Sequence, residues 1–207
     1  MSKKQKKSKE ESPDQKTILI DTTLSLAGEL GWPSVTMQLI GKTANVPLSE
    51  VSAIFSSKWD ILEAFRERTD LLLIAGKSAN LSGQSAKDRL FDILMARIEI
   101  IEPWKAGIGS IARHAVAQPI IGIRLFTSLN KSMARMIEHV DVKIQGPGTL
   151  VQSHGLTLIY LLVLRRWIGD HSSDLGPTMA ELNEKLISAN QLVSRICGWR
   201  KSAKPYP

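Results

Sequence analysis

Between residues 13 and 200, apolar residues recur at intervals of three and four, and glycine and proline interrupt them at short distances. This spacing is typical of amphipathic helices, because it places the apolar side chains on one face of the helix. No segment shows the sustained apolar–polar alternation of a half-buried strand. The sequence therefore predicts an all-α fold, and 207 residues are enough to bury a core.

Capping residues and helix breakers place the boundaries of these helices. Ser12-Pro13 predicts the start of the first helix, and Gly31 predicts its end. The Ser/Gly/Asn-rich stretch 76–85 indicates a boundary between two domains. By the same signals, further helices are expected over Thr36–Ala44 and Leu48–Ile54, from Lys58 after a Ser57 cap, and over about 86–101, 104–117, 120–138, 149–169 and 178–197.

Charge is distributed unevenly along the chain, whose formal net charge is +7. Five lysines fall within the first nine residues, residues 10–80 carry six Lys/Arg against ten Asp/Glu, and residues 81–207 carry sixteen against ten. A basic total alone is thus a weak sign of nucleic-acid binding. The expected organisation is a disordered basic tail (1–12), a small three-helix domain (13–57), a connecting helix (58–80), a larger helical domain (81–200) and a frayed C-terminal tail (201–207).

The window 36–62 has the spacing of a helix-turn-helix. Two short helices that cross steeply need a small residue at the crossing, which Gly41 supplies. Asn45 stands at the turn, where a residue that tolerates a positive φ is needed. The apolar and small residues at the expected core positions are Ile40, Gly41, Ala44, Val46, Val51 and Ile54.

The flanks of this window resemble the N-terminal domain of the TetR family of transcriptional regulators. The resemblance rests on the run Ile18–Gly31, on Thr36, and on Phe55-Ser56-Ser57-Lys58 followed by Ile61-Leu62. A late pattern is also similar to many members: Trp167, Asp170, Ser172, Asp174, Thr178 and Leu182. The resemblance implies a three-helix head that binds DNA and a helical bundle that binds ligand and dimerises.

What the resemblance implies for function is a one-component regulator, expected to be a repressor. The basic N-terminus is not followed by the apolar segment of a secretory signal, so the expected compartment is the cytoplasm. It would bind double-stranded DNA as a homodimer and respond to a small hydrophobic effector. Lys58 is the expected phosphate contact. The other candidate DNA contacts are Thr36, Gln38, Pro47, Leu48, Ser49 and Ser52.

The presumed recognition helix Leu48–Ile54 departs from the family pattern. Ser52 and Ile54 stand where the family usually has a tyrosine and another His, Tyr or Trp that contact phosphates. The helix has no Lys or Arg, and its one charge is Glu50. Phosphate neutralisation supplies much of DNA affinity. These departures keep a rival open, a TetR-fold protein that has lost DNA binding and binds a lipid, as proteins of ubiquinone biosynthesis do.

The larger domain has candidates for a ligand pocket and for a dimer interface. Trp104, Phe126, Met133 and Trp167 are the pocket candidates, although aromatic and Met residues at helical spacing more often form plain core. The segment from Leu156 to Ile168 is apolar nearly all round and predicts burial on several faces. With the last helix it could form a two-fold interface, or it could be buried inside one chain; the interface candidates are Leu158, Leu161, Leu162, Arg165, Leu182 and Leu186.

Catalysis has little support in the sequence. The four histidines lack metal-ligand spacing, and Gly107-x-Gly109 lacks the preceding strand that a dinucleotide-binding loop requires. Cys197 is the only cysteine, so no intramolecular disulfide or cysteine-based zinc site can form. The longest apolar run, from Leu156 to Leu164, is too short to span a membrane. We therefore expect neither an enzyme nor a cofactor, a metal or a membrane span.

Overall fold

The structure is a computed structural model, and it describes residues 14–76, 84–139 and 149–202. Within these ranges every regular element is a helix, which confirms the all-α prediction. In chain order the elements are α1 (Gln15–Leu30), the 3-10 helix η1 (Trp32–Ser34), α2 (Met37–Ala44), α3 (Leu48–Ile54), α4 (Lys58–Gly76), α5 (Ala86–Ile101), the 3-10 helix η2 (Glu102–Trp104), α6 (Lys105–Ala117), α7 (Pro119–His139), α8 (Thr149–Ile168) and α9 (Gly176–Ser202).

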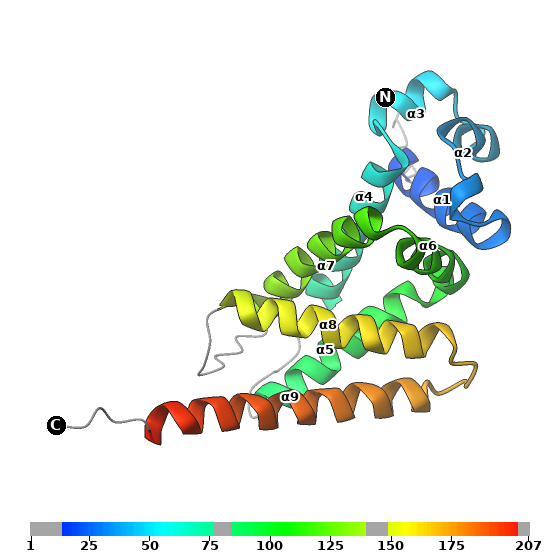
Figure 1. The fold of residues 1–207 in the computed structure, drawn as a ribbon. Coiled ribbons are helices and arrows are strands. Elements are labelled where there is room, and N and C mark those ends of the chain that lie inside the picture. The colour runs from blue at the N-terminus through cyan, green and yellow to red at the C-terminus, as the bar shows by residue number, and fades with distance from the viewer. Residues whose placement is uncertain (1–13, 77–83, 140–148, 203–207) are drawn as a thin grey trace, which may run out of the picture.

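A small head and a larger body are joined by α4 (Figure 1). The head consists of α1, α2 and α3, and α4 leaves it to pack against α5 and α7. In the body, α8 lies between α7 and α9 and packs along both. The head also rests directly on the body, because α6 packs across α1. This arrangement gives the head two connections to the body, one through α4 and one through α6.

The helix-turn-helix of the head closes as its sequence predicts. Asn45 adopts the left-handed conformation with φ 56°, at the turn between α2 and α3. A Cβ atom on Gly41 would lie 2.8 Å from the carbonyl oxygen of Val46, so only glycine permits this approach. The head core is built from α1, η1, α2 and α3, together with one residue each from α4 and α6. Its buried apolar side chains are Leu19, Ile20, Leu24, Leu26, Ala27, Trp32, Val35, Ile40, Val51, Phe55, Ile61 and Ile111.

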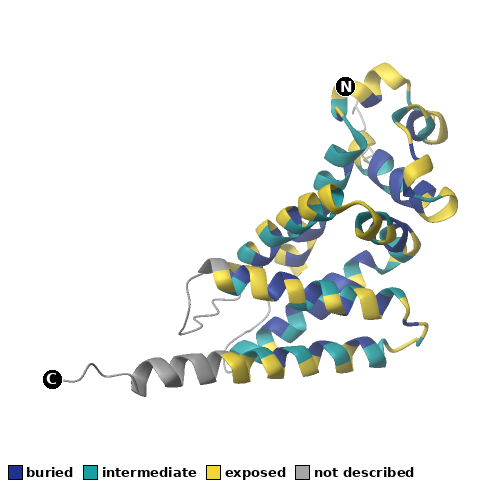
Figure 2. Cartoon of the chain, in the orientation of Figure 1, coloured by how far each residue is buried: buried dark blue, intermediate teal, exposed yellow. Residues whose placement is uncertain are grey.

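The body has its own core, in which α5, α7, α8 and α9 contribute buried apolar side chains. Figure 2 shows buried residues on the inward faces of these helices and exposed residues on the outward faces. Leu73 brings α4 into the same core. The largest fully buried side chains here are Trp167 and Tyr160. Phe65 of α4 packs against both cores, so this helix connects them. The division into a small and a larger helical domain stays a prediction.

The helix ends differ from the sequence prediction at the two termini. The predicted start at Ser12-Pro13 lies outside the described residues, and α1 begins at Gln15 after Asp14. The last helix is longer than predicted: α9 begins at Gly176 and continues to Ser202, two residues into the segment expected to be a tail. No helix in the described residues is long and apolar enough to cross a membrane.

Candidate functional site

The candidate DNA-contacting residues of α2 and α3 lie on the surface of the head. Thr36 caps α2 by accepting a hydrogen bond from the backbone N–H of Leu39 at 3.2 Å, as the sequence predicts. Ser49 and Ser52 lie one turn apart on α3, and Leu48 precedes them with 42% of its surface exposed. All six candidates of the two helices are exposed: Thr36, Gln38, Pro47, Leu48, Ser49 and Ser52. The surface is therefore available to a partner, and contact with DNA stays a prediction.

Lys58 has an internal role that the sequence did not reveal. Its ammonium donates hydrogen bonds to the carbonyl oxygens of Trp32 and Val35, each at 3.0 Å. It also lies 4.4 Å from the centroid of the Trp32 ring. Partial burial lowers the pKa of this amine below its ordinary value. Lys58 therefore fastens α4 to the η1 segment, whereas its expected phosphate contact remains untested.

The charged residues of the head are few, and the acidic ones outnumber the lysines. In residues 14–57, which the structure describes throughout, the lysines are Lys16 and Lys42, and both are exposed. Glu50 of α3 accepts a hydrogen bond from the Gln15 side chain at 2.9 Å. The sequence analysis did not consider Lys16 and Lys42, although their positions near helix ends were readable from the chain.

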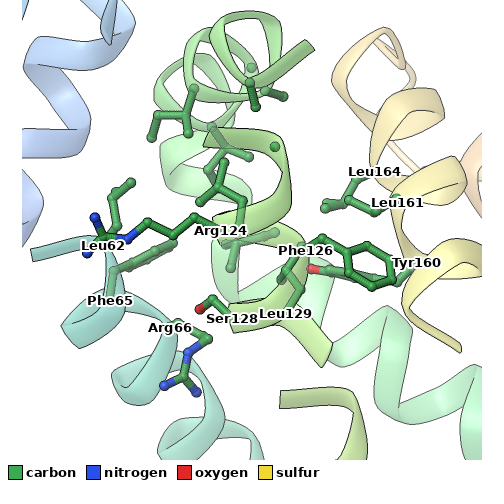
Figure 3. A pocket seen from close by; sticks show the side chains of 18 of the residues that line it. Leu62, Phe65, Arg66, Arg124, Phe126, Ser128, Leu129, Tyr160, Leu161 and Leu164 are labelled. Atoms are coloured by element: carbon green, nitrogen blue, oxygen red, sulfur yellow. The ribbon is translucent and has the colours of Figure 1, made fainter. Parts of the chain in front are cut away.

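A cavity of about 830 Å³ opens between α4, α6, α7 and α8. Most of its lining is apolar, and Figure 3 shows Phe126, Leu129, Leu161 and Leu164 around it. This size lies within the range of small-molecule sites.

Of the four residues predicted to line a pocket, Phe126 alone does so.

The other three pocket candidates belong elsewhere, which corrects the prediction. Met133 lies on the same face of α7 as Phe126, but two turns further along, where the neighbouring helices close and bury it completely. Trp167 is fully buried in the body core, and its indole N–H donates to Glu102. Trp104 packs outside the cavity, edge-on to Phe65 at 5.4 Å between ring centroids.

A buried ionic cluster lies beside the cavity and was missed by the sequence analysis. The Asp70 carboxylate accepts from Arg66 at 2.9 Å and from Arg97 at 2.5 Å. It also accepts from the Ser132 hydroxyl, and Arg97 donates to the Tyr160 hydroxyl at 3.2 Å. Burial is the main reason that the pKa of Tyr160 lies above its ordinary value, so its hydroxyl stays protonated. Asp70 thus joins α4, α5 and α7, and Arg97 extends the cluster to α8.

Two of the predicted interface residues are buried within the chain itself. Leu182 and Leu186 face the body core, with 0% and 4% of their surface exposed. The prediction for this pair is therefore wrong, because α9 turns them toward α8 and α5. Leu161 and Arg165 line the cavity instead. Leu158 and Leu162 are exposed on α8, as a surface interface would require.

The late motif around Asp170 holds the connection between α8 and α9. The Asp170 carboxylate accepts hydrogen bonds from the backbone N–H groups of Ser172 and Thr178, both at 3.0 Å, and from both hydroxyls. Bonds from Ser172, then from Thr178, hold the pKa of this buried carboxyl well below its ordinary value. This geometry closes the loop before α9 and caps the start of that helix. Among the described residues, no group of His, Cys, Asp and Glu could hold a metal ion.

Comparison with known proteins identifies the fold. No protein-family model matches the sequence, and no curated protein matches it at a significant level. A TetR transcriptional regulator from Nitrosomonas europaea matches with a TM-score of 0.70 at 20% identity, over 85% of this chain and 98% of that chain. One from Rhodococcus sp. RHA1 matches with a TM-score of 0.55 at 15% identity, over 84% and 94%.

A third solved structure contains a ligand. Thermus thermophilus FadR, a TetR-family transcriptional repressor in complex with lauroyl-CoA, matches with a TM-score of 0.57 at 16% identity, over 83% of this chain and 91% of that chain. The present chain therefore has the fold of TetR-family transcriptional regulators, in agreement with the resemblance seen in its sequence.

Proposed function

We propose that this protein is a ligand-responsive transcriptional regulator that binds operator DNA as a homodimer and acts as a repressor. The observation that carries the proposal is the position of α4. Ile61 of this helix lies in the core of the head, and its neighbours Leu62 and Phe65 line the cavity of the body. A molecule in the cavity would contact the same rigid helix that orients the head.

This arrangement supports opposing effects of DNA and effector. A two-fold dimer would place two α3 helices in successive major grooves, about 34–36 Å apart. An occupant that shifts α4 changes the separation of the heads, so it lowers DNA affinity, and DNA lowers ligand affinity by the same factor. The lauroyl-CoA complex of the Thermus thermophilus repressor supports ligand binding by a chain of this fold.

The dimer part of the proposal rests on the outer surface of α8 and α9. Leu158 and Leu162 are 55% and 47% exposed on α8, and Ile187 is 39% exposed on α9. Apolar side chains on adjacent helices suit a four-helix contact between two copies. The variant Leu158→Glu/Leu162→Glu should turn a dimer into a monomer in light scattering after size exclusion. An unchanged mass would contradict this interface, and a monomeric parent protein would contradict the dimer.

The test of DNA binding is fluorescence anisotropy with the DNA that flanks the protein's own coding region. We expect saturable binding, a preference over scrambled DNA and a steep fall of affinity with salt, because each neutralised phosphate releases counterions. Ser49→Ala/Ser52→Ala should lower affinity for the preferred sequence. The matched control is Ser25→Ala, which alters an exposed serine of α1.

The second candidate function is lipid binding without DNA binding. The acidic character of the head favours it, since Asp14, Asp21, Glu29 and Glu50 outnumber the two lysines of residues 14–57. Weak binding that ignores DNA sequence, and that disappears when residues 1–9 are deleted, would assign the affinity to the basic tail. That result would overturn the regulator proposal for the flanking DNA and favour the lipid-binding alternative.

A further inference from the structure

The cavity between α4, α6, α7 and α8 combines an apolar interior with a strongly cationic set of ionisable residues. Its lining contains five arginines, at positions 66, 97, 113, 124 and 165, and a single carboxylate, Glu63. The remaining lining is almost entirely aliphatic and aromatic, apart from Ser128 and Tyr160. In ligand pockets of this kind, a few polar or charged groups fix the orientation of the ligand and provide specificity.

The two inner arginines are already neutralised by carboxylates. Arg66 pairs with Glu63 at 3.1 Å, with Glu67 at 3.2 Å and with Asp70 at 2.9 Å. Its guanidinium points along α4, away from the other side chains labelled in Figure 3. Arg97 shares Asp70. These two residues therefore provide little net charge to an occupant.

The three outer arginines are different. Arg113, Arg124 and Arg165 are exposed, they come from α6, α7 and α8, and each lines the cavity. In the part of the chain that the structure describes, none of them forms an ion pair with a carboxylate. Their charges consequently remain available at the opening.

These side chains come from three different walls of the cavity. Arg124 extends from α7 toward Leu62 and Phe65 of α4 (Figure 3), and its guanidinium lies 5.2 Å from the centroid of the Trp59 ring. Arg113 folds back along α6, toward its crossing with α8, the helix that carries Arg165. An occupant therefore meets hydrocarbon inside and guanidinium groups at the mouth.

From this lining we infer that the occupant is an amphiphile with an apolar chain and an anionic head group, a carboxylate or a phosphate. The chain would lie among Phe126, Leu129 and Leu164, and the head group would bind the rim arginines Arg113, Arg124 and Arg165. Guanidinium groups suit both oxyanions because they donate two parallel hydrogen bonds. The inference rests on the proposed ligand role of the cavity and names the chemistry of that ligand.

A head-group series tests the inference directly, by calorimetry on the full-length protein without DNA. The probes share a twelve-carbon chain and are kept below their micelle concentrations: dodecanoate, dodecyl phosphate, dodecanol and dodecyltrimethylammonium. We expect the two anions to bind at least tenfold more tightly than the alcohol, and the cation to bind most weakly. The ratio of dodecanoate to dodecyl phosphate affinity then distinguishes a carboxylate from a phosphate source. Tighter binding of the alcohol or the cation, or no binding of any probe, would overturn the inference.

Variants locate the head group. Arg113→Gln/Arg124→Gln/Arg165→Gln should weaken dodecanoate binding by roughly tenfold or more, because charged hydrogen bonds are lost, and should leave dodecanol binding unchanged. The control is Arg166→Gln, which removes an exposed charge next to Arg165 that does not line the cavity. Equal affinities of the triple variant and the control would assign the arginines to solubility alone and contradict the inference.

Chain length and salt provide independent measurements. From octanoate to decanoate, each added methylene should tighten binding by up to about fourfold if the chain is buried. Rising salt should weaken dodecanoate binding but not dodecanol binding, because the rim charges are exposed. A salt-independent dodecanoate affinity would count against the arginine rim. Should the anions bind as predicted while DNA affinity stays unaffected by them, the regulator proposal fails and the ligand assignment stands.

Discussion

Gly107 of α6 lies so close to Leu24 of α1 that a Cβ atom at position 107 would stand 2.2 Å from the Leu24 carbonyl oxygen. No side chain fits at this distance, so the contact requires glycine. Gly28 of α1 lies against the same turn, 3.2 Å from the Gly107 backbone nitrogen when a Cβ is added. Gly107, in the Gly107-x-Gly109 sequence that lacked the context of a dinucleotide loop, thus serves the contact between head and body, whereas Gly109 lies against Ile168 of α8.

The first prediction concerns this contact. Gly107→Ala should lower the free energy of unfolding by about 1–3 kcal/mol, as overpacked sites do, since α6 must move away from α1. Urea unfolding followed by circular dichroism measures the effect. Gly76→Ala is the control, because a Cβ there meets no atom within 4 Å. Equal stability of the two variants would show that the two helices separate without cost.

The second prediction concerns the buried carboxylate of Asp70. Asp70→Asn leaves the buried guanidinium of Arg97 without its charged partner. The loss of one partner of a buried ion pair typically lowers the free energy of unfolding by about 3–5 kcal/mol. The matched control is Asp21→Asn, which breaks the more exposed pair with Arg68 and should cost about 1 kcal/mol or less. Denaturant titration of both variants checks the difference. If the two variants lose similar amounts of unfolding free energy, water reaches the Asp70 cluster.

The third prediction separates two roles of Lys58. If its bonds to Trp32 and Val35 dominate, Lys58→Ala should destabilise the protein by about 1–3 kcal/mol. The exposed Lys42→Ala should change stability little. Thermal unfolding provides the comparison. Unchanged stability together with an equal loss of affinity for every DNA sequence would instead indicate the phosphate contact.

The fourth prediction is a pH dependence centred on Asp170. The folded state holds the pKa of this carboxyl below its ordinary value of 3.8, so the unfolded chain binds the proton more readily. Asp170 therefore contributes stability above about pH 5, and this contribution is lost as the pH falls below 3.8. The stability difference between the parent protein and Asp170→Asn should shrink from pH 7 to pH 3 in urea titrations. A constant difference over that range would contradict the cap geometry.

Predictions that depend on neighbours along the chain agree with the structure. The Thr36 cap, the left-handed Asn45 and the close approach at Gly41 follow from backbone chemistry within a few residues. The bounds of α2, α3 and α5 follow from the same local rules. The helical periodicity of the sequence predicted no strands, and the residues that the structure describes form none.

The placement of single side chains depended on distant neighbours. Phe126 and Met133 share a face of α7, yet one lines a cavity and the other is sealed in the core. Leu182 and Leu186 are apolar residues four positions apart on a helix, as residues of a helical interface would be. In the structure, however, α9 turns both toward the body core. Helical periodicity identifies a buried face and does not say what covers it.

The sequence by itself determined the helical elements, their order and the helix-turn-helix, because capping, glycine conformation and apolar periodicity act over a few residues. Only the tertiary structure decided that Lys58 bonds to the backbone of η1, that Asp70 pairs with arginines of α4 and α5, and that the outer arginines line one cavity. Several of these contacts join residues that lie dozens of positions apart in the sequence. They arise from how the helices cross, which local sequence does not specify.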